Sequence, residues 1–418
     1  MFLLSLVLKS LKNRKLTTLL TIFSIALSVM LLVGVENIRR AARDSFSGTV
    51  SQTDLIVGAP SGAVQLMLYT IFHIGAPTAN VSYEAYQKYS NHPRVDWTIP
   101  ISLGDSHRGF RVVATDDDFY EHFRFRGDRR VEFAQGYAPR SVFDVVLGSE
   151  VAEKLHYDLN AEVIIAHGMS NFVQHKERPF KVSGILERTG TPIDRSLYIS
   201  LYGMEAIHVD WDRGAPPLPG QATPADQLTR DRLQIHQITA FLLKGKSRMM
   251  TLGLQREINT DESESLMAII PGVTLAEMWQ GIGYAEQALQ LISIIVVLVG
   301  LAGMLMTVYS SLNERRREMA ILRAVGAHPY QILLLMILES GLLSIAGCAL
   351  GLTILYAGIF ITQPLIEDYS GLYIAIRWPG WVEGAYLFGV ILAGFLLGLV
   401  PALRAYRNTL SDGLTIRV

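Results

Sequence analysis

Four long apolar stretches constrain this chain more than any other feature. Thr17–Val35, Gln287–Ser310 and Ala385–Leu403 contain no charged residue, and Ile332–Thr362 contains only Glu339. Each stretch is long enough to cross the roughly 30 Å hydrocarbon core of a bilayer as a helix. The sequence therefore predicts a membrane α-helical fold with four transmembrane helices.

The first stretch could also belong to a signal peptide, because Lys9, Lys12, Arg14 and Lys15 precede it. Its apolar run is longer than the 7–15 residues that are typical of signal peptides, and no A-x-A cleavage site follows before Glu36. We therefore expect a span that is retained.

Residues 36–285 separate the first and second spans and have the composition of a soluble domain. Helical spacing in Glu36–Phe46 and Leu275–Leu289 predicts stalk helices that extend the two spans. Between the stalks, strand and helix patterns alternate, which predicts a large extracytoplasmic α+β domain. The expected helices are Ser82–Ser90 and Ser149–Leu155, and the expected strands are Arg111–Ala114, Val145–Leu147, Ala161–Ala166, Phe180–Leu186 and Ser196–Ser200. The Gly- and Pro-rich segment Trp211–Pro224 is expected to be a surface loop.

The distribution of cations orients the spans, because Lys and Arg gather in short cytoplasmic flanks. Three flanks are basic: the N-terminal flank, the loop between spans two and three (Arg315, Arg316, Arg317, Arg323) and the C-terminal tail (Arg404, Arg407, Arg417). Arg39, Arg40 and Arg43, on the other side of span one, disagree but are partly offset by Glu36 and Asp44. We expect a multi-pass protein of the bacterial inner membrane with both termini in the cytoplasm.

These expectations divide the chain into eight parts. They are an N-terminal cytoplasmic helix with the first span (1–35), the stalks with the periplasmic α+β domain (36–285), the second span (286–310), a cytoplasmic helix (311–330), the third span (331–363), a periplasmic loop (364–383), the fourth span (384–404) and a cytoplasmic tail (405–418).

The sequence lacks the motifs of several common classes of binding and catalytic site. The formal net charge of −1 argues against nucleic-acid binding, and the single cysteine, Cys348, excludes an internal disulfide and metal sites built on several cysteines. The segment Ala240–Ser247 ends in Gly-Lys-Ser but has Ala240 where a phosphate-binding loop needs its first glycine. No G-x-S-x-G or H-E-x-x-H motif occurs. We predict no catalytic residue, cofactor or metal site.

Two polar clusters leave a choice open. Nine of the ten histidines lie in the α+β domain without close ligand spacing, and His167 and His175 are eight residues apart. Scattered surface or core positions are the favoured interpretation, and metal binding is the alternative. The run Asp116–Asp118 is interpreted as a solvated turn whose Asp caps the following helix.

The segment Asn313–His328 carries the most specific signal. Its apolar residues lie on one face of a short amphipathic helix, its arginines lie largely off that face, and Gly326 is a plausible end of the helix. Such a helix could be held under the membrane by anionic lipid, or it could dock a cytoplasmic protein. The candidate docking residues are Arg316, Arg317, Glu318, Ile321, Leu322, Arg323, Ala324, Val325 and Gly326.

The order of four motifs resembles the MacB/FtsX/LolC-like permeases of ABC transporters, the mechanotransmission family. The motifs are the basic N-terminal segment Lys9–Thr21, the Val146–Leu155 and Phe180–Leu186 pair, Arg317–Ala327, and the ending Pro401–Arg407. The resemblance implies that Arg316–Gly326 couples to a separate cytoplasmic ATPase dimer, which holds the ATP and Mg²⁺, and that stalks carry its motion to the periplasmic domain. It also implies a second permease chain, identical or different.

The resemblance leaves the substrate open. Family members export or extract peptides, lipoproteins, toxins or antibiotics, and some work with a periplasmic adaptor, a lipoprotein or an outer-membrane channel. An FtsX-like regulator of a periplasmic enzyme and a metal- or haem-handling permease are the alternatives.

Residues inside the spans suggest how the helices pack. Gly347 with Gly351, and Gly394 with Gly398, are small-xxx-small pairs that let helices approach closely, either within the chain or between two chains. Glu339 is expected to be paired or to take part in a conformational change, because a bare carboxylate is costly in lipid. The third span would be about 46 Å long at 1.5 Å per residue, so it must tilt, bend near Gly341 or Gly347, or protrude.

Overall fold

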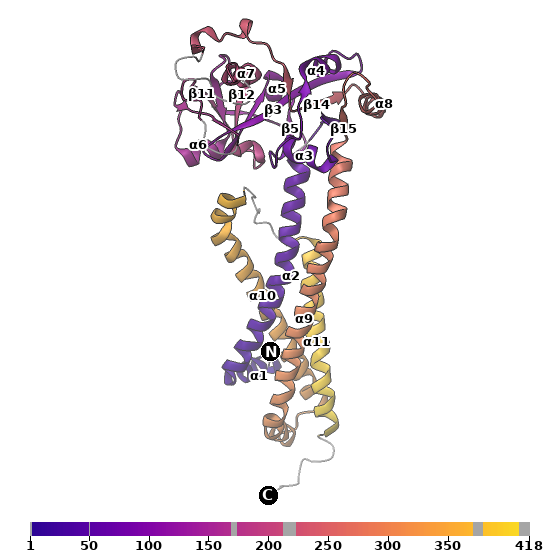
Figure 1. Ribbon diagram of the computed structural model, residues 1–418. Coiled ribbons are helices and arrows are strands. Elements are labelled where there is room, and N and C mark those ends of the chain that lie inside the picture. The colour runs from indigo at the N-terminus through magenta and orange to yellow at the C-terminus, as the bar shows by residue number, and fades with distance from the viewer. Residues whose placement is uncertain (1, 50, 169–173, 212–222, 371–378, 409–418) are drawn as a thin grey trace. The chain divides into compact units, whose positions relative to one another are not determined.

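A computed structural model of the chain describes residues 2–49, 51–168, 174–211, 223–370 and 379–408. The chain divides into two compact units, a helical unit and a unit that holds residues 43–281. The boundaries between the units fall inside two long helices, α2 and α9, which are labelled in Figure 1.

The helical unit contains four helices that are long and apolar enough to cross a membrane. Their candidate spans are Lys15–Ala41, Pro271–Ser310, Pro329–Gln363 and Trp381–Leu403. The helices themselves are α2 (Lys15–Thr49), α9 (Pro271–Ala324), α10 (Pro329–Ser370) and α11 (Trp381–Asn408), and the short α1 (Phe2–Asn13) precedes them. The four predicted spans are confirmed. Both stalk predictions are also confirmed as helix, since α2 continues to Thr49 and α9 begins at Pro271.

Residues 43–281 form the α+β domain, which lies in sequence between the first and second spans, as predicted. An 11-stranded sheet runs in the order β15-β1-β14-β3-β4-β12-β8-β11-β7, with β10 added to β3 and β9 added to β11. Its strands are β1 (Leu55–Gly58), β3 (Val95–His107), β4 (Phe110–Thr115), β7 (Phe133–Gly136), β8 (Asp144–Leu147), β9 (Glu162–Val163), β10 (Ala166–His167), β11 (Phe180–Leu186), β12 (Ser196–Ser200), β14 (Ala240–Gly245) and β15 (Met267–Ile269).

Two small two-stranded sheets and several helices complete the domain. The small sheets pair β2 (Val81–Ser82) with β13 (Gln237–Ile238) and β5 (Arg124–Phe125) with β6 (Arg129–Arg130). The α-helices are α3 (Ala63–Ile71), α4 (Tyr83–Ser90), α5 (Asp117–His122), α6 (Ser149–Leu155), α7 (Leu201–His208) and α8 (Arg248–Asn259). Three 3₁₀ turns are Pro192–Arg195, Ala225–Gln227 and Arg230–Arg232.

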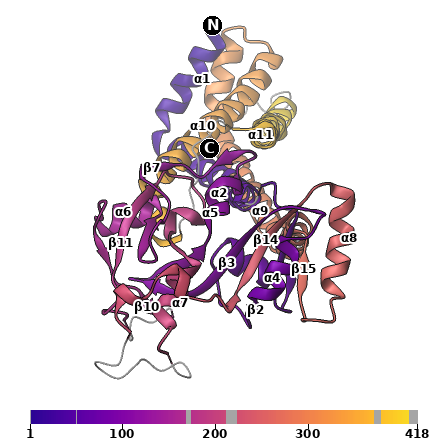
Figure 2. The same cartoon turned by 90° about the horizontal axis from the view of Figure 1, so that it is seen from above.

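The long strand β3 joins the two halves of the large sheet. Its first half, from Val95 to Ile101, pairs with β14, and its second half, from Ser102 to His107, pairs with β4. Figure 2 shows β3 in the middle of the domain, next to β14. The strand was not predicted, because Pro100 and Gly104 interrupt its pattern and both residues are unfavourable inside a strand.

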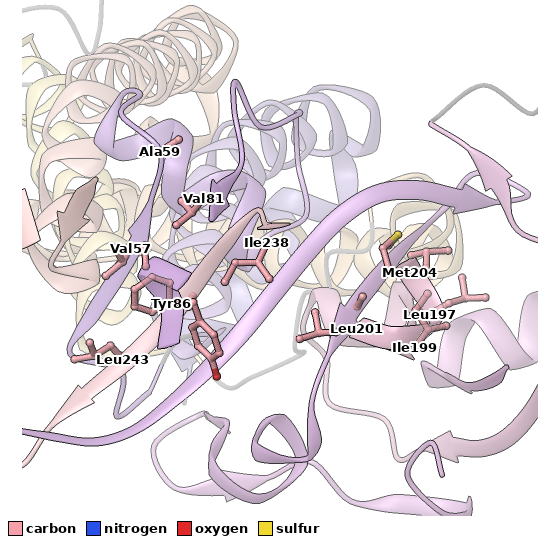
Figure 3. Close-up of a cluster of buried hydrophobic side chains, with 14 of the residues drawn as sticks. Val57, Ala59, Val81, Tyr86, Leu197, Ile199, Leu201, Met204, Ile238 and Leu243 are labelled. Atoms are coloured by element: carbon pink, nitrogen blue, oxygen red, sulfur yellow. The ribbon is translucent and has the colours of Figure 1, made fainter. Parts of the chain in front are cut away.

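The sheet buries both of its faces. Leu55 and Val57 of β1 belong to one hydrophobic cluster and Ile56 to another, as the period of two in a strand requires. Figure 3 shows side chains of the first cluster in two groups, one around Val57 and Tyr86 and one around Leu197 and Met204. Burial on both faces explains why the strands read as short continuous apolar runs.

Most of the predicted local elements of the domain are confirmed. Helix α6 and the strands β11 and β12 have the predicted bounds, and α4 begins one residue after its N-cap, Ser82, whose side chain accepts a hydrogen bond from the amide of Ala85. The expected strand 161–166 is two shorter strands, β9 and β10. Within the expected loop 211–224, residues 212–222 lie outside the described part of the chain.

Two sequence interpretations are wrong. Asn313–His328 does not begin a separate helix, because α9 continues without a break from Pro271 to Ala324. Asp116 takes the N-cap position of α5, but its side chain makes no capping hydrogen bond and its Oδ1 is buried without a partner among the described residues. Burial and the neighbouring Asp118 raise the pKa of Asp116 to about 8.

Candidate functional site

The predicted docking segment forms the C-terminal end of α9. The helix ends at Ala324, and Gly326 follows with a φ of +99°, a left-handed conformation that favours glycine and stops the helix. Ile321 and Val325, four residues apart, are exposed at 56% and 84%, and Ala324 is exposed between them. The side chains of Arg316, Arg317, Glu318, Leu322 and Arg323 lie outside the described part of the structure. The end of α9 thus presents apolar side chains that the described residues leave exposed.

The four glycines of the small-xxx-small pairs pack against helices of the same chain. A Cβ built on Gly347 would lie 2.6 Å from Cγ2 of Ile25, and one on Gly351 would lie 2.6 Å from the carbonyl oxygen of Ala26. These two positions form a close contact of α10 with α2.

The second pair forms a contact of α11 with α10. A Cβ on Gly394 would overlap the hydroxyl of Ser344, and one on Gly398 would overlap the hydroxyl of Ser340. Glu339, beside this contact, is 5% exposed. Of the two packing partners that the sequence left open, the structure shows the one within the chain.

Four polar residues of the α+β domain come together although the sequence separates them. Asp105 and His167 are cross-strand partners in the β3–β10 ladder, and His208 is the last residue of α7. Gln174 bridges back to Ala166, which places His175 beside His167. Figure 2 shows β10 and α7 side by side. We call Asp105, His167, His175 and His208 the histidine cluster; one ligand atom from each lies within 4.8 Å of the others.

The distances within the histidine cluster are short. Nδ1 of His167 lies 3.1 Å from Nε2 of His208 and 3.3 Å from Oδ1 of Asp105. Nε2 of His208 lies 3.4 Å from Oδ2 of Asp105, and Nε2 of His175 lies 3.9 Å from the same oxygen. The hydrogen bond from His167 to Asp105 raises the pKa of His167, whereas burial lowers the pKa of His175 to about 4. His175 is therefore neutral at neutral pH, and its ring can offer a lone pair to a metal ion.

Spacing in the sequence gave only a weak signal for the histidine cluster. His167 and His175 are eight residues apart, but Asp105 and His208 come from other segments. A second group that could hold a metal ion, Asp118, Glu121 and His122 on α5, is more exposed. The near miss for a phosphate-binding loop is strand β14, which pairs with β1 and β3 and leaves no loop for a phosphate.

Two family models match most of the chain. A MacB-like periplasmic core domain matches residues 18–232, and an FtsX-like permease C-terminal model matches residues 291–410. The chain belongs to the MacB/FtsX-like family of ABC transporter permeases. The permease is therefore a multi-pass membrane protein, and its α+β domain is the periplasmic domain of this family.

Curated relatives agree with this family. The permease is 23% identical over 306 residues to a pyoverdine export ATP-binding/permease protein of Pseudomonas fluorescens, an alignment that covers 71% of the permease and 41% of the relative. It is 31% identical over 133 residues to the macrolide export ATP-binding/permease protein MacB of Escherichia coli, covering 30% and 19%. An uncharacterized ABC transporter permease of Methanocaldococcus jannaschii is 31% identical over 109 residues, 26% of each chain. The permease spans less than half the length of these relatives.

Two of the cations that disagreed with the predicted orientation, Arg39 and Arg40, form ion pairs. Glu36, which is 4% exposed, accepts hydrogen bonds at 3.0 Å from Nε of Arg39 and from Nε of Arg40. Arg39 also lies 3.6 Å from Glu286 of α9, and Arg40 lies 3.1 Å from Glu383 of α11. The sequence pointed to Glu36 but not to the partners on α9 and α11. These ion pairs connect α2 with α9 and α11.

Proposed function

We propose that the permease couples ATP hydrolysis by a separate cytoplasmic ATPase dimer to a conformational change of its periplasmic domain. In this proposal two permease chains assemble with the ATPase in the bacterial inner membrane, with their termini in the cytoplasm. The change exports or extracts a peptide, lipoprotein, toxin or antibiotic. In this proposal the ATPase holds the ATP and Mg²⁺, as the resemblance of Arg317–Ala327 to the family's coupling region implies.

The exposed apolar end of α9 carries this proposal. Ile321 and Val325 lie inside the FtsX-like match and would be unfavourable in water, so a protein partner that covers them gains apolar burial. The same helix continues without interruption back to Pro271 in the domain unit. In this proposal a displacement of its cytoplasmic end is passed along this one helix.

Co-purification of the ATPase tests the docking. The permease is co-expressed with the host's ABC ATPase subunits, and the ATPase that the tagged permease retains is quantified. We expect Arg323→Glu and Ala324→Asp to lower ATPase recovery while membrane insertion persists, because neither residue lies in a candidate span. Met249→Asp is the matched control, since Met249 is 89% exposed on α8 of the domain. Recovery equal to wild type in both α9 variants would remove this segment from the mechanism.

Thiol labelling tests the proposed orientation. Cys348 is replaced by Ala, and single cysteines are placed at Met249 and Val325, both exposed. A membrane-impermeant maleimide added to intact spheroplasts is expected to label only position 249. Labelling of position 325 alone would invert the topology.

A further inference from the structure

The histidine cluster contains buried polar atoms that lack partners. Asp105 is fully buried, and its Oδ1 accepts a hydrogen bond from the amide of Gly168 at 3.2 Å. Its Oδ2 is buried with no hydrogen-bond partner among the described residues, and the same holds for Nε2 of His175. A buried polar atom without a partner is unfavourable, so such atoms in a native fold call for an explanation.

The hydrogen bonds around the cluster leave its lone pairs directed inward. Nδ1 of His208 lies 2.8 Å from the carbonyl oxygen of Met204, which can only accept, so this nitrogen carries the proton. Nε2 of His208 is then an unprotonated nitrogen that faces Asp105 and His167. A histidine that is fixed by a backbone carbonyl through its distal N–H is the usual arrangement of a metal ligand.

The spacing of the ligand atoms fits a tetrahedral ion. Zn–N and Zn–O bonds of about 2.0–2.1 Å place the ligand atoms of a tetrahedron about 3.3–3.4 Å apart. The distances of 3.1, 3.4 and 3.9 Å between the nearest atoms of the cluster bracket this value. Movement of a few tenths of an ångström would bring three nitrogens and one oxygen into a zinc coordination shell.

We propose that Asp105, His167, His175 and His208 bind one divalent transition-metal ion, Zn²⁺ in preference to the oxygen-seeking Mg²⁺ and Ca²⁺. Three imidazoles and one carboxylate form a donor set that suits Zn²⁺. With four protein ligands the site is closed, as in zinc sites that hold segments together. The ion would connect β3, β10, the residue after the Gln174 bridge and the end of α7. The proposal is independent of the coupling to an ATPase.

Trp211 supplies an optical readout for the site. Its ring lies 4.5 Å from the ring of His167, 4.9 Å from that of His175 and 5.7 Å from that of His208. A paramagnetic ion such as Co²⁺ in the cluster is expected to quench its fluorescence. Co²⁺ also reports four-coordinate geometry directly through its visible absorption.

The test uses the full chain in detergent, purified without a polyhistidine tag and stripped with EDTA. Zn²⁺ binding is measured by competition with a chromophoric chelator, and Co²⁺ binding is measured by visible absorption and tryptophan fluorescence. We expect one equivalent of metal per chain with a tetrahedral Co²⁺ spectrum. Asp105→Asn and His167→Ala should each weaken binding by more than about 100-fold, the upper limit that is typical of changes outside the coordination shell.

Matched controls distinguish this site from other histidines. His236→Ala removes an exposed histidine of the same domain. His122→Ala removes the histidine of the second possible metal-binding group, on α5. Both variants should keep full affinity. His167 is the most exposed of the three histidines, at 43% of its side chain, so His167→Ala is the variant least able to disturb the fold. A cooperative thermal transition in EDTA shows that this variant is folded. The absence of saturable Zn²⁺ binding by the wild type would overturn the proposal. Undiminished affinity of a folded His167→Ala chain, or loss of binding in His122→Ala, would also overturn it.

Discussion

Arg178 is the residue whose replacement should destabilise the periplasmic domain most clearly. Its guanidinium donates hydrogen bonds to the carbonyl oxygen of Ala206, to the carboxylate of Asp210 and, at 3.2 Å, to the carbonyl oxygen of Thr223. Its side chain is 5% exposed and that of Asp210 is 18% exposed. Arg178 therefore fixes the end of α7, the helix that carries His208.

The magnitude follows from what Arg178→Met would leave behind. Removal of one partner of a buried ion pair costs about 3–5 kcal/mol of unfolding free energy. Asp210 would keep the hydrogen bonds from the amide and hydroxyl of Thr223, both at 2.8 Å, so we expect the lower end, about 3 kcal/mol. For a unit of about 240 residues, each kcal/mol lowers the melting temperature by about 2–4 °C. The expected loss is about 6–12 °C.

Thermal unfolding of the full chain in detergent and EDTA, followed by tryptophan fluorescence, measures this loss. Arg232→Gln is the control, because Arg232 is exposed and its change should stay within about 0.5 kcal/mol. Asp210→Asn should cost less, and the double variant Arg178→Met/Asp210→Asn should be less destabilised than the sum of the single variants. A melting temperature of Arg178→Met within about 2 °C of wild type would refute the assigned pairing.

Two further predictions concern Asp116 and the contact of α10 with α11. Because the folded pKa of Asp116 is raised to about 8, its neutral form is favoured in the fold, and stability should be lost as pH rises from about 4 towards 8. Asp116→Asn should flatten the dependence of the melting temperature on pH over this range, and an unchanged slope would contradict the assignment. Gly394→Ala should lower the thermal stability of the detergent-solubilised chain by about 1–3 kcal/mol, since the new Cβ overlaps Ser344. The control Gly389→Ala meets no atom within 4 Å and should be neutral or stabilising, because alanine favours a helix more than glycine does. Equal melting temperatures for the two variants would exclude a tight contact.

The sequence was most informative where one local pattern decides the structure. The uncharged spans and the short apolar strands β11 and β12 are such patterns, because burial on both faces allows few polar residues. Pattern reasoning failed at β3, where Pro100 and Gly104 break the strand pattern although strands on both sides hold the chain extended.

The same limit applies to the candidate sites: the sequence points to sites made of neighbouring residues and misses sites that the fold assembles. The candidate docking residues at the end of α9 are consecutive in the sequence, so a local pattern was enough to propose them, and Gly326 does follow the end of the helix. The complete histidine cluster could not be located from the sequence, because strand pairing and the position of α7 bring its members together. The partners of Arg39 and Arg40 on α9 and α11 were missed for the same reason.

The rate of ATP hydrolysis in a reconstituted complex tests the central claim most directly. The purified permease alone should hydrolyse no ATP, and its addition to the purified ATPase in lipid should change the rate. Val325→Asp, at the exposed end of α9, should abolish this change, whereas the control Met249→Asp should preserve it. Hydrolysis by the permease alone, or a wild-type response from Val325→Asp, would contradict coupling through this helix end.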